Sequence, residues 1–136
     1  MLLPRPISAV IFDMDGLLLD TVPLYAEAMV QAGQDVGVNI THSYVLSLVG
    51  LLGSELQARL IADHDPGFPI TNYLKAMNTR LEPLLAGRVA LKPGAADLAK
   101  YLSSQKVPLA IATSMKHAEA RHHLDATGLS PYFQIV

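Results

Sequence analysis

The stretch "AVIFDMDGLLLDT", residues 9–21, places two carboxylates directly after an apolar segment. Residues 8–12 ("SAVIF") are mostly apolar and β-branched, which is typical of a strand buried on both faces in a parallel sheet. Asp13 and Asp15 follow, and residues i and i+2 of an extended chain point to the same side. Two carboxylates this close repel each other unless a cation or a proton lies between them. The stretch therefore predicts either a divalent-metal site or a pair in which one carboxylate attacks and the other transfers a proton.

The composition excludes several functional classes. The chain has 136 residues, 51% of them hydrophobic, which fits one small domain or a core with an insert. The net charge is −2 and no basic stripe is present, so we expect no nucleic-acid partner. Cysteine is absent, which excludes disulfides and thiolate chemistry. The first eight residues, "MLLPRPIS", do not resemble a signal peptide, and no apolar run approaches the ~20 residues of a membrane span, so we expect a cytoplasmic protein without a membrane partner.

The order of elements predicts an α/β fold with an insertion. A second apolar run, "VPLAIAT" (107–113), predicts another strand, and "YFQIV" (132–136) looks like the start of a third. Helices are expected on both sides of the 107–113 strand, the later one ending at Gly128, so this part should form a right-handed parallel unit. Four helices are expected between the first two strands, the last of them kinked or shortened at Pro83. They are too many for one crossover, so we expect a Rossmann-like core (1–19 and 89–136) and an inserted helical subdomain (20–88).

The end of the second predicted strand carries groups that suit a phosphate. Thr113 and Ser114 offer hydroxyls and backbone amides before a helix, which is a common anion site, although ordinary helix capping is the alternative. Lys116 lies in the expected first helical turn, where a cation is unfavourable for the helix dipole unless it meets an anion. The histidines at 117, 122 and 123 lack the i, i+4 spacing of a helical zinc pair, so we expect surface positions for them.

Three segments together resemble one family. "FDMDGLLLDT" resembles the first motif of the haloacid dehalogenase superfamily of phosphohydrolases, and "LAIATS" before a helix resembles the second. "ALKPGAADLAKYL" resembles the segment by which the cap returns to the core in the β-phosphoglucomutase-like subgroup, and the first motif is similar in wording to pseudouridine-5′-phosphatase-like members. The resemblance covers nearly the whole chain and implies a Rossmann-like core whose helical insert, residues 20–88, is a cap.

The resemblance also implies roles for individual residues. Asp13 would be the nucleophile and a metal ligand, and Asp15 the general acid/base, with its backbone carbonyl as a second ligand of Mg²⁺. Thr113 would hydrogen-bond the transferring phosphoryl group, helped by the amides of Ser114, Asp15 and Gly16.

The implied function is a Mg²⁺-dependent phosphatase of a small phosphorylated metabolite, such as a sugar or nucleoside monophosphate, acting through an aspartyl-phosphate. A sugar phosphomutase of the β-phosphoglucomutase type is the alternative. A truncated, non-catalytic binding module is the second alternative, because the family's third-motif lysine and fourth-motif acidic pair are not found. We therefore expect residues 1–136 to be the N-terminal portion of a protein of about 200–230 residues, with an incomplete sheet.

Overall fold

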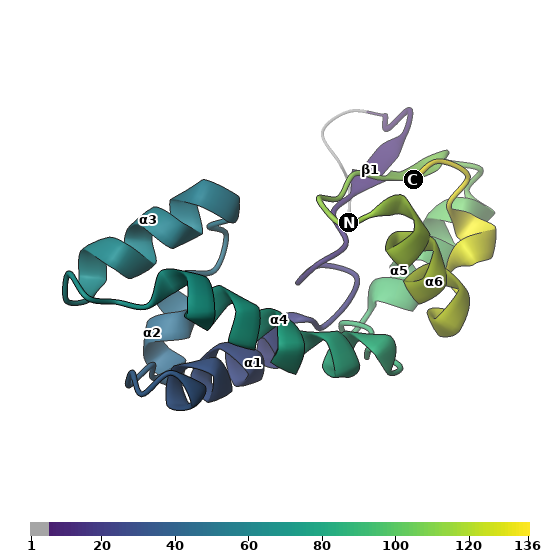
Figure 1. Ribbon diagram of the computed structural model, residues 1–136. Helices are drawn as coiled ribbons and strands as arrows, with labels where there is room; N and C mark the ends of the chain where they lie inside the picture. The colour runs from purple at the N-terminus through teal and green to yellow at the C-terminus, as the bar shows by residue number, and fades with distance from the viewer. Residues whose placement is uncertain (1–5) are drawn as a thin grey trace. The chain divides into compact units, whose positions relative to one another are not determined.

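The structure, a computed structural model, describes residues 6–136 and divides them into two compact units (Figure 1). The core unit comprises the described residues up to Thr21 together with Arg88–Val136, and the helical unit comprises Val22–Gly87. The expected division of the sequence, at 19/20 and 88/89, differs from these bounds by two residues and one. The interpretation of the helical unit as a cap remains a prediction.

The core unit is built on a parallel pair of strands. Strand β1 (Val10–Phe12) pairs with β2 (Leu109–Ile111), and Phe12 lies opposite Ile111 in the register. Phe12 is buried, but the side chain of Ile11 is 70% exposed in the described part of the chain. The expectation that β1 is buried on both faces is therefore wrong for this structure. The α/β class and the parallel pairing are as expected from the two apolar runs.

The segment after α6 contacts β2 through one isolated β-bridge. Residues Ser130–Tyr132 form a short 3-10 helix, η1, where a strand was expected from residue 132 onward. Strand-like pairing is found only at Ile135 within residues 132–136. Ile135 forms a parallel bridge with Ala110, and the amide of Ile111 donates to the Ile135 carbonyl at 2.9 Å.

Two helices complete the core unit. Helix α5 (Ala95–Ser104) contacts β2 and η1, and α6 (His117–Thr127) contacts η1. Helix α6 ends as predicted at Gly128, whose φ of +74° is a left-handed conformation that glycine adopts without steric cost. Phe133 then returns to the sheet, where its ring meets that of Phe12 edge to face at 5.6 Å.

The two segments that connect the core unit with the helical unit are paired with each other inside the core unit. The amide of Asp20 donates to the Ala90 carbonyl at 2.8 Å, and the amide of Lys92 donates to the Leu18 carbonyl at 2.9 Å. Lys92 Nζ also lies 3.2 Å from Asp20 Oδ1. The outgoing and returning chains therefore form a short antiparallel ribbon.

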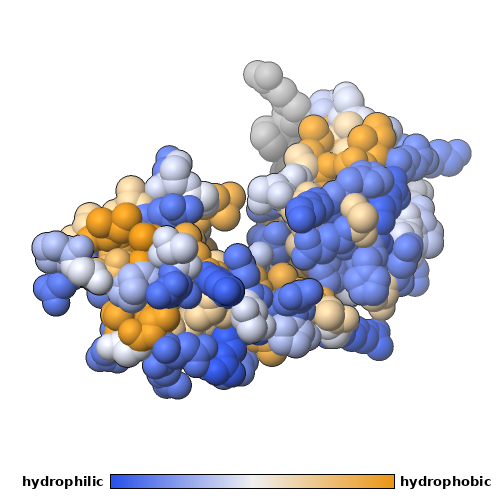
Figure 2. Space-filling model, viewed as in Figure 1, coloured by the Kyte–Doolittle hydropathy of each residue, from blue (hydrophilic) through white to orange (hydrophobic). Residues whose placement is uncertain are grey.

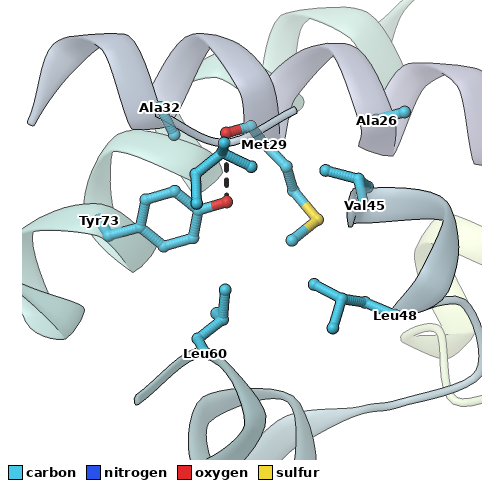
Figure 3. Close-up of a cluster of buried hydrophobic side chains, with 8 residues drawn as sticks. Ala26, Met29, Ala32, Val45, Leu48, Leu60 and Tyr73 are labelled. Carbon is cyan, nitrogen blue, oxygen red and sulfur yellow. Dashed lines mark hydrogen bonds between the residues drawn. The ribbon is translucent and has the colours of Figure 1, made fainter. Parts of the chain in front are cut away.

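The helical unit contains α1 (Val22–Asp35), α2 (His42–Ser47), α3 (Gly53–Asp63) and α4 (Ile70–Ala86). Helix α1 packs along α4, with α2 against α1 and α3 against α4. Figure 3 shows the buried cluster between these helices, in which the Tyr73 hydroxyl donates to the Met29 carbonyl at 3.1 Å. The labelled members are Ala26, Met29, Ala32, Val45, Leu48, Leu60 and Tyr73.

Two details of the helical unit concern Pro83 in α4 and Gly33 in α1. Helix α4 runs through Pro83 to Ala86, so it is not shortened at Pro83, and the expected kink stays a prediction. After α1 the chain folds back over Gly33, whose carbonyl accepts from the Val38 amide at 2.8 Å.

The surface carries exposed hydrophobic side chains on both units. Figure 2 shows a group of hydrophobic residues at the end of the core unit where Figure 1 labels β1. Ile11 and Ile135 are among the exposed large hydrophobic residues of this unit. Within residues 6–136, no helix combines the length and the apolar character that crossing a bilayer requires.

Candidate active site

Asp13 is the first residue after β1 and its side chain is exposed. Its Oδ1 accepts a hydrogen bond from the Met14 amide at 2.7 Å. The ladder between the strands continues to this point, because the Ala112 amide donates to the Phe12 carbonyl at 2.9 Å. The carboxyl ends of β1 and β2 therefore meet at one edge, which is where ligands bind in parallel α/β sheets.

A tight turn begins at Met14, between Asp13 and Asp15. The Met14 carbonyl accepts from the amides of Leu18 and Leu19 at 3.0 and 2.9 Å, and Gly16 has a φ of +74°. Glycine is suited to this left-handed position because a Cβ atom would be strained there. The turn gives the two acids different surroundings: Asp13 is exposed, whereas Asp15 is half-buried.

The surroundings of Asp15 perturb its carboxyl group. Its Oδ1 is buried and has no hydrogen-bond partner among the described residues. Burial is the largest effect and raises the pKa of Asp15, while hydrogen bonding from Thr21 lowers it. Asp13 raises this pKa further through charge repulsion, and His123 and Glu119 contribute smaller effects of opposite sign. A carboxyl group that holds its proton more strongly than usual is suited to general acid catalysis.

Thr21 supports the same turn. It is fully buried, and its hydroxyl accepts from the Gly16 amide at 3.2 Å. The Gly16 amide also donates to the Leu19 carbonyl at 2.9 Å, so in this structure both acceptors lie inside the turn. The position of Thr21 in "LLLDT", one turn beyond the aspartates, was the only sequence signal for this contact.

The residues after β2 do not cap the following helix. Thr113 Oγ1 accepts from the Met115 amide at 3.1 Å, and α6 begins only at His117. The residue at the N-cap position is Lys116, which is exposed and makes no side-chain capping bond. The capping alternative for Thr113 and Ser114 is therefore wrong, whereas their role toward a phosphate, like that of Lys116, stays a prediction.

His123 lies in the core unit rather than on its surface. Its side chain is 1% exposed, and neither Nδ1 nor Nε2 has a hydrogen-bond partner in the described residues. Burial lowers the pKa of His123, the neighbouring His122 lowers it further, and Glu119 and Asp15 oppose this. The expected surface position is wrong for His123. Its place beside the buried Leu124 in the apolar stripe of α6 was the available signal.

The donor atoms at this edge are oxygens. Asp13 and Asp15 offer carboxylates, and within residues 6–136 no group of three or more histidine or acidic side chains is placed to hold a metal. Such a donor set does not suit zinc, which usually takes nitrogen or sulfur ligands. It does suit Mg²⁺, which is commonly held by one or two carboxylates together with water and phosphate oxygens.

Comparison with known proteins gives concordant matches. The model of the haloacid dehalogenase-like hydrolase family matches residues 10–136. The chain is 29% identical over 129 residues to "Phosphorylated carbohydrates phosphatase" of Thermotoga maritima, covering 95% of this chain. It is 32% identical over 119 residues to "Probable pseudouridine-5'-phosphatase" of Saccharomyces cerevisiae, covering 87% of this chain.

A solved structure from Thermotoga maritima, assigned provisionally as a β-phosphoglucomutase, superposes with a TM-score of 0.67 at 29% identity over 95% of this chain. The chain spans 60% of that structure, and 60% and 50% of the two relatives named above. The match to the family model nevertheless extends over most of the chain, including both aspartates and the segment after β2. The chain therefore belongs to the haloacid dehalogenase-like hydrolase family.

Proposed function

We propose that the protein containing this chain is a phosphatase of small phosphorylated metabolites. The observation that carries the proposal is the unequal carboxyl pair at the end of β1. Asp13 is exposed and able to attack, whereas Asp15 is half-buried and this burial raises its pKa. An exposed carboxyl group beside a half-buried one is an arrangement suited to a nucleophile and an acid.

The proposed reaction has two steps. A carboxylate oxygen of Asp13 attacks phosphorus, the bond from phosphorus to the leaving oxygen breaks, and Asp15 gives its proton to that oxygen. In the second step Asp15 takes a proton from a water molecule whose oxygen attacks the aspartyl-phosphate, which releases phosphate and restores Asp13. Thr113 and Ser114, at the end of the neighbouring strand β2, are proposed to bind the phosphoryl oxygens, with Lys116 as a further contact. The Gly16 amide would join them only by giving up its bonds to Thr21 and Leu19.

Mg²⁺ is part of the proposal, and the groups that would hold it are the carboxylate of Asp13 and the backbone carbonyl of Asp15. When bound, the ion would reduce the repulsion between the attacking carboxylate and the negatively charged phosphate. The oxygen donors at this edge of the sheet support this choice of metal.

The substrate class is proposed from the relatives. Two of them are named for phosphorylated carbohydrates and for pseudouridine 5′-phosphate, so we propose a sugar or nucleoside monophosphate. Such charged metabolites do not cross a hydrocarbon bilayer readily, and the proposal includes action in the cytoplasm, where they are formed. The likeness to a provisionally assigned β-phosphoglucomutase supports a second candidate, in which the phosphoryl group returns to a sugar instead of passing to water.

A substrate panel with the full-length gene product tests the proposal. Phosphate release is measured from sugar phosphates and nucleoside monophosphates, first after chelation and then with Mg²⁺ restored. We expect hydrolysis of at least one ester only with the metal. ³¹P NMR of the same mixtures separates the two candidates, because a mutase moves the phosphorus signal to a new sugar position without release of phosphate. Hydrolysis that persists after complete chelation contradicts the metal requirement.

Variants test the assigned roles. Asp13→Asn should abolish turnover because the nucleophile is lost. Asp15→Ala should lower kcat by about 10²–10⁴-fold, the usual contribution of general acid–base catalysis, with a smaller effect on substrate binding. Asp97→Asn, which changes an exposed acid in the first turn of α5, is the matched control and should retain full activity. Near-normal turnover of Asp13→Asn would refute the mechanism.

A further inference from the structure

The peptide group that joins Asp15 to Gly16 is hydrogen-bonded at one end only. Its N–H, on Gly16, donates to the Thr21 hydroxyl at 3.2 Å and to the Leu19 carbonyl at 2.9 Å. Its carbonyl, on Asp15, accepts no backbone hydrogen bond among the residues that the structure describes. Backbone carbonyls are strong acceptors, so this oxygen is available to a ligand at the end of β1.

The geometry of a peptide links these two ends. The atoms of a trans peptide lie close to one plane, and its N–H and C=O point in opposite directions. The described part of the chain contains no cis peptide. Because both acceptors of the Gly16 N–H lie inside the turn, the Asp15 carbonyl points out of it. This carbonyl is the group proposed above to hold Mg²⁺ together with Asp13.

Thr21 supplies the side-chain acceptor in this arrangement. It is the residue before α1 and is only 1% exposed. Valine has nearly the same shape as threonine and differs mainly in the hydroxyl, so packing alone does not account for threonine here. The contact from the buried hydroxyl to the Gly16 amide gives Thr21 a direct influence on the orientation of the Asp15–Gly16 peptide.

We propose that Thr21 is a positioning residue for the metal: by accepting from the Gly16 N–H, it fixes the plane of the Asp15–Gly16 peptide and so the direction of the Asp15 carbonyl. This inference rests on the metal part of the proposed function, because that direction matters only if the oxygen binds Mg²⁺. Hydrogen-bond partners that orient a metal ligand typically contribute about 10–100-fold to metal affinity. The Leu19 carbonyl remains in every Thr21 variant, so the effect lies near the lower end of this range.

The test measures metal binding by the full-length protein without substrate. The probe is Mn²⁺, which takes the same oxygen ligands as Mg²⁺. Free Mn²⁺ is measured by electron paramagnetic resonance, and Mg²⁺ is measured by its displacement of Mn²⁺. Turnover alone would not isolate the peptide, because Thr21 also acts on the carboxyl group of Asp15.

Three variants are compared with the wild type. Thr21→Val keeps the shape of the side chain and removes the acceptor, whereas Thr21→Ser keeps the acceptor and removes a methyl group. Thr127→Val is the matched control, because it removes from α6 a hydroxyl that donates to the His123 carbonyl at 2.7 Å in the same unit. Circular dichroism verifies that each variant is folded.

We expect Thr21→Val to raise the Kd for both ions about tenfold, and Thr21→Ser and Thr127→Val to change it by less than about twofold. A merely structural role predicts a different pattern, because Thr21→Ser leaves a cavity at a buried position whereas Thr21→Val keeps the packing. Partial unfolding lowers the number of sites rather than the affinity of each site, so the fitted Kd separates the two roles.

The positioning role is overturned if Thr21→Val binds both ions as the wild type does, or if Thr21→Ser loses as much affinity as Thr21→Val. If Thr21→Val does not fold, Thr21→Ala replaces it and must show the same weakening. A wild-type protein that binds neither ion refutes the proposed metal and this inference with it. A wild type that binds both ions but hydrolyses no ester of the panel refutes the phosphatase proposal, and the Thr21 variants still decide how the metal ligand is positioned.

Discussion

Replacing Gly33 by alanine should destabilise the helical unit, although the same change usually stabilises a helix. Alanine is favoured over glycine in a helix interior by about 1 kcal/mol. At Gly33, however, the new Cβ would lie 2.7 Å from the Val38 carbonyl oxygen and 2.7 Å from Cγ1 of Ile40. Real Cβ atoms do not approach other atoms this closely, so the segment that folds back over α1 would have to move.

The magnitude follows from what this movement would disturb. The Val38 oxygen belongs to the backbone and accepts from the Ile40 amide at 3.1 Å, so it cannot rotate away like a flexible side chain. Overpacking of a tight site typically costs about 1–3 kcal/mol, and a weakened hydrogen bond adds to this. After subtraction of the helix preference, which is reduced in the last turn of α1, we expect a net loss of about 1–2 kcal/mol.

The assay is urea unfolding followed by far-UV circular dichroism. Gly67→Ala is the matched control, because a Cβ atom added at Gly67 would meet no other atom within 4 Å and the φ angle there is not positive. That variant should be neutral or more stable by up to about 1 kcal/mol, through loss of freedom in the unfolded chain. A Gly33→Ala protein as stable as wild type would refute the close packing of residues 36–40 on α1.

The remaining predictions concern two tyrosines of the helical unit. Tyr73→Phe removes the buried hydrogen bond to the Met29 carbonyl and should cost about 1–2 kcal/mol in urea unfolding, whereas Tyr101→Phe, at an exposed position of the core unit, should cost nothing measurable. Burial, followed by the interaction with Asp63, raises the pKa of Tyr44 to about 12. Because the unfolded tyrosine ionises near pH 10, the folded state loses stability as the pH rises from about 10 to 12. Tyr44→Phe should reduce this loss, measured as the difference between urea midpoints at about pH 9 and about pH 11.5; an equal loss in the variant would contradict the role of Tyr44.

Local chemistry made part of the fold predictable. The apolar strands before Asp13 and Thr113, and the helix stop at Gly128, each depend on a few neighbouring residues and are found as expected. Helix α4 continues past Pro83 and packs along α1, a tertiary contact that a single segment cannot reveal. The exposure of Ile11 is likewise a tertiary property, because it depends on what covers that face of the sheet.

The sequence indicated the two acids of the candidate site, but it did not indicate how far each side chain near them would be buried. The alternation of Asp13 and Asp15 after a strand indicated paired carboxylates, but it did not indicate that the turn at Gly16 would bury one of them. Helix capping was the alternative interpretation of Thr113, yet its hydroxyl closes a small turn before α6. His123 was expected on the surface because the histidines lack the spacing of a helical zinc pair, whereas its position in the buried stripe of α6 decides its environment.

The ribbon formed by the outgoing and returning chains has a consequence for engineering. Since the Asp20 amide and the Ala90 carbonyl are hydrogen-bonded, the sequence between them leaves and rejoins the core unit at neighbouring points. Antiparallel neighbours can be joined by a turn of about two to five residues. Residues 22–87 can thus be excised and replaced by a short hairpin loop, or exchanged for a foreign domain whose termini lie close together. Either graft would leave the Asp20–Lys92 ion pair and the ribbon intact, because both lie wholly within the recipient.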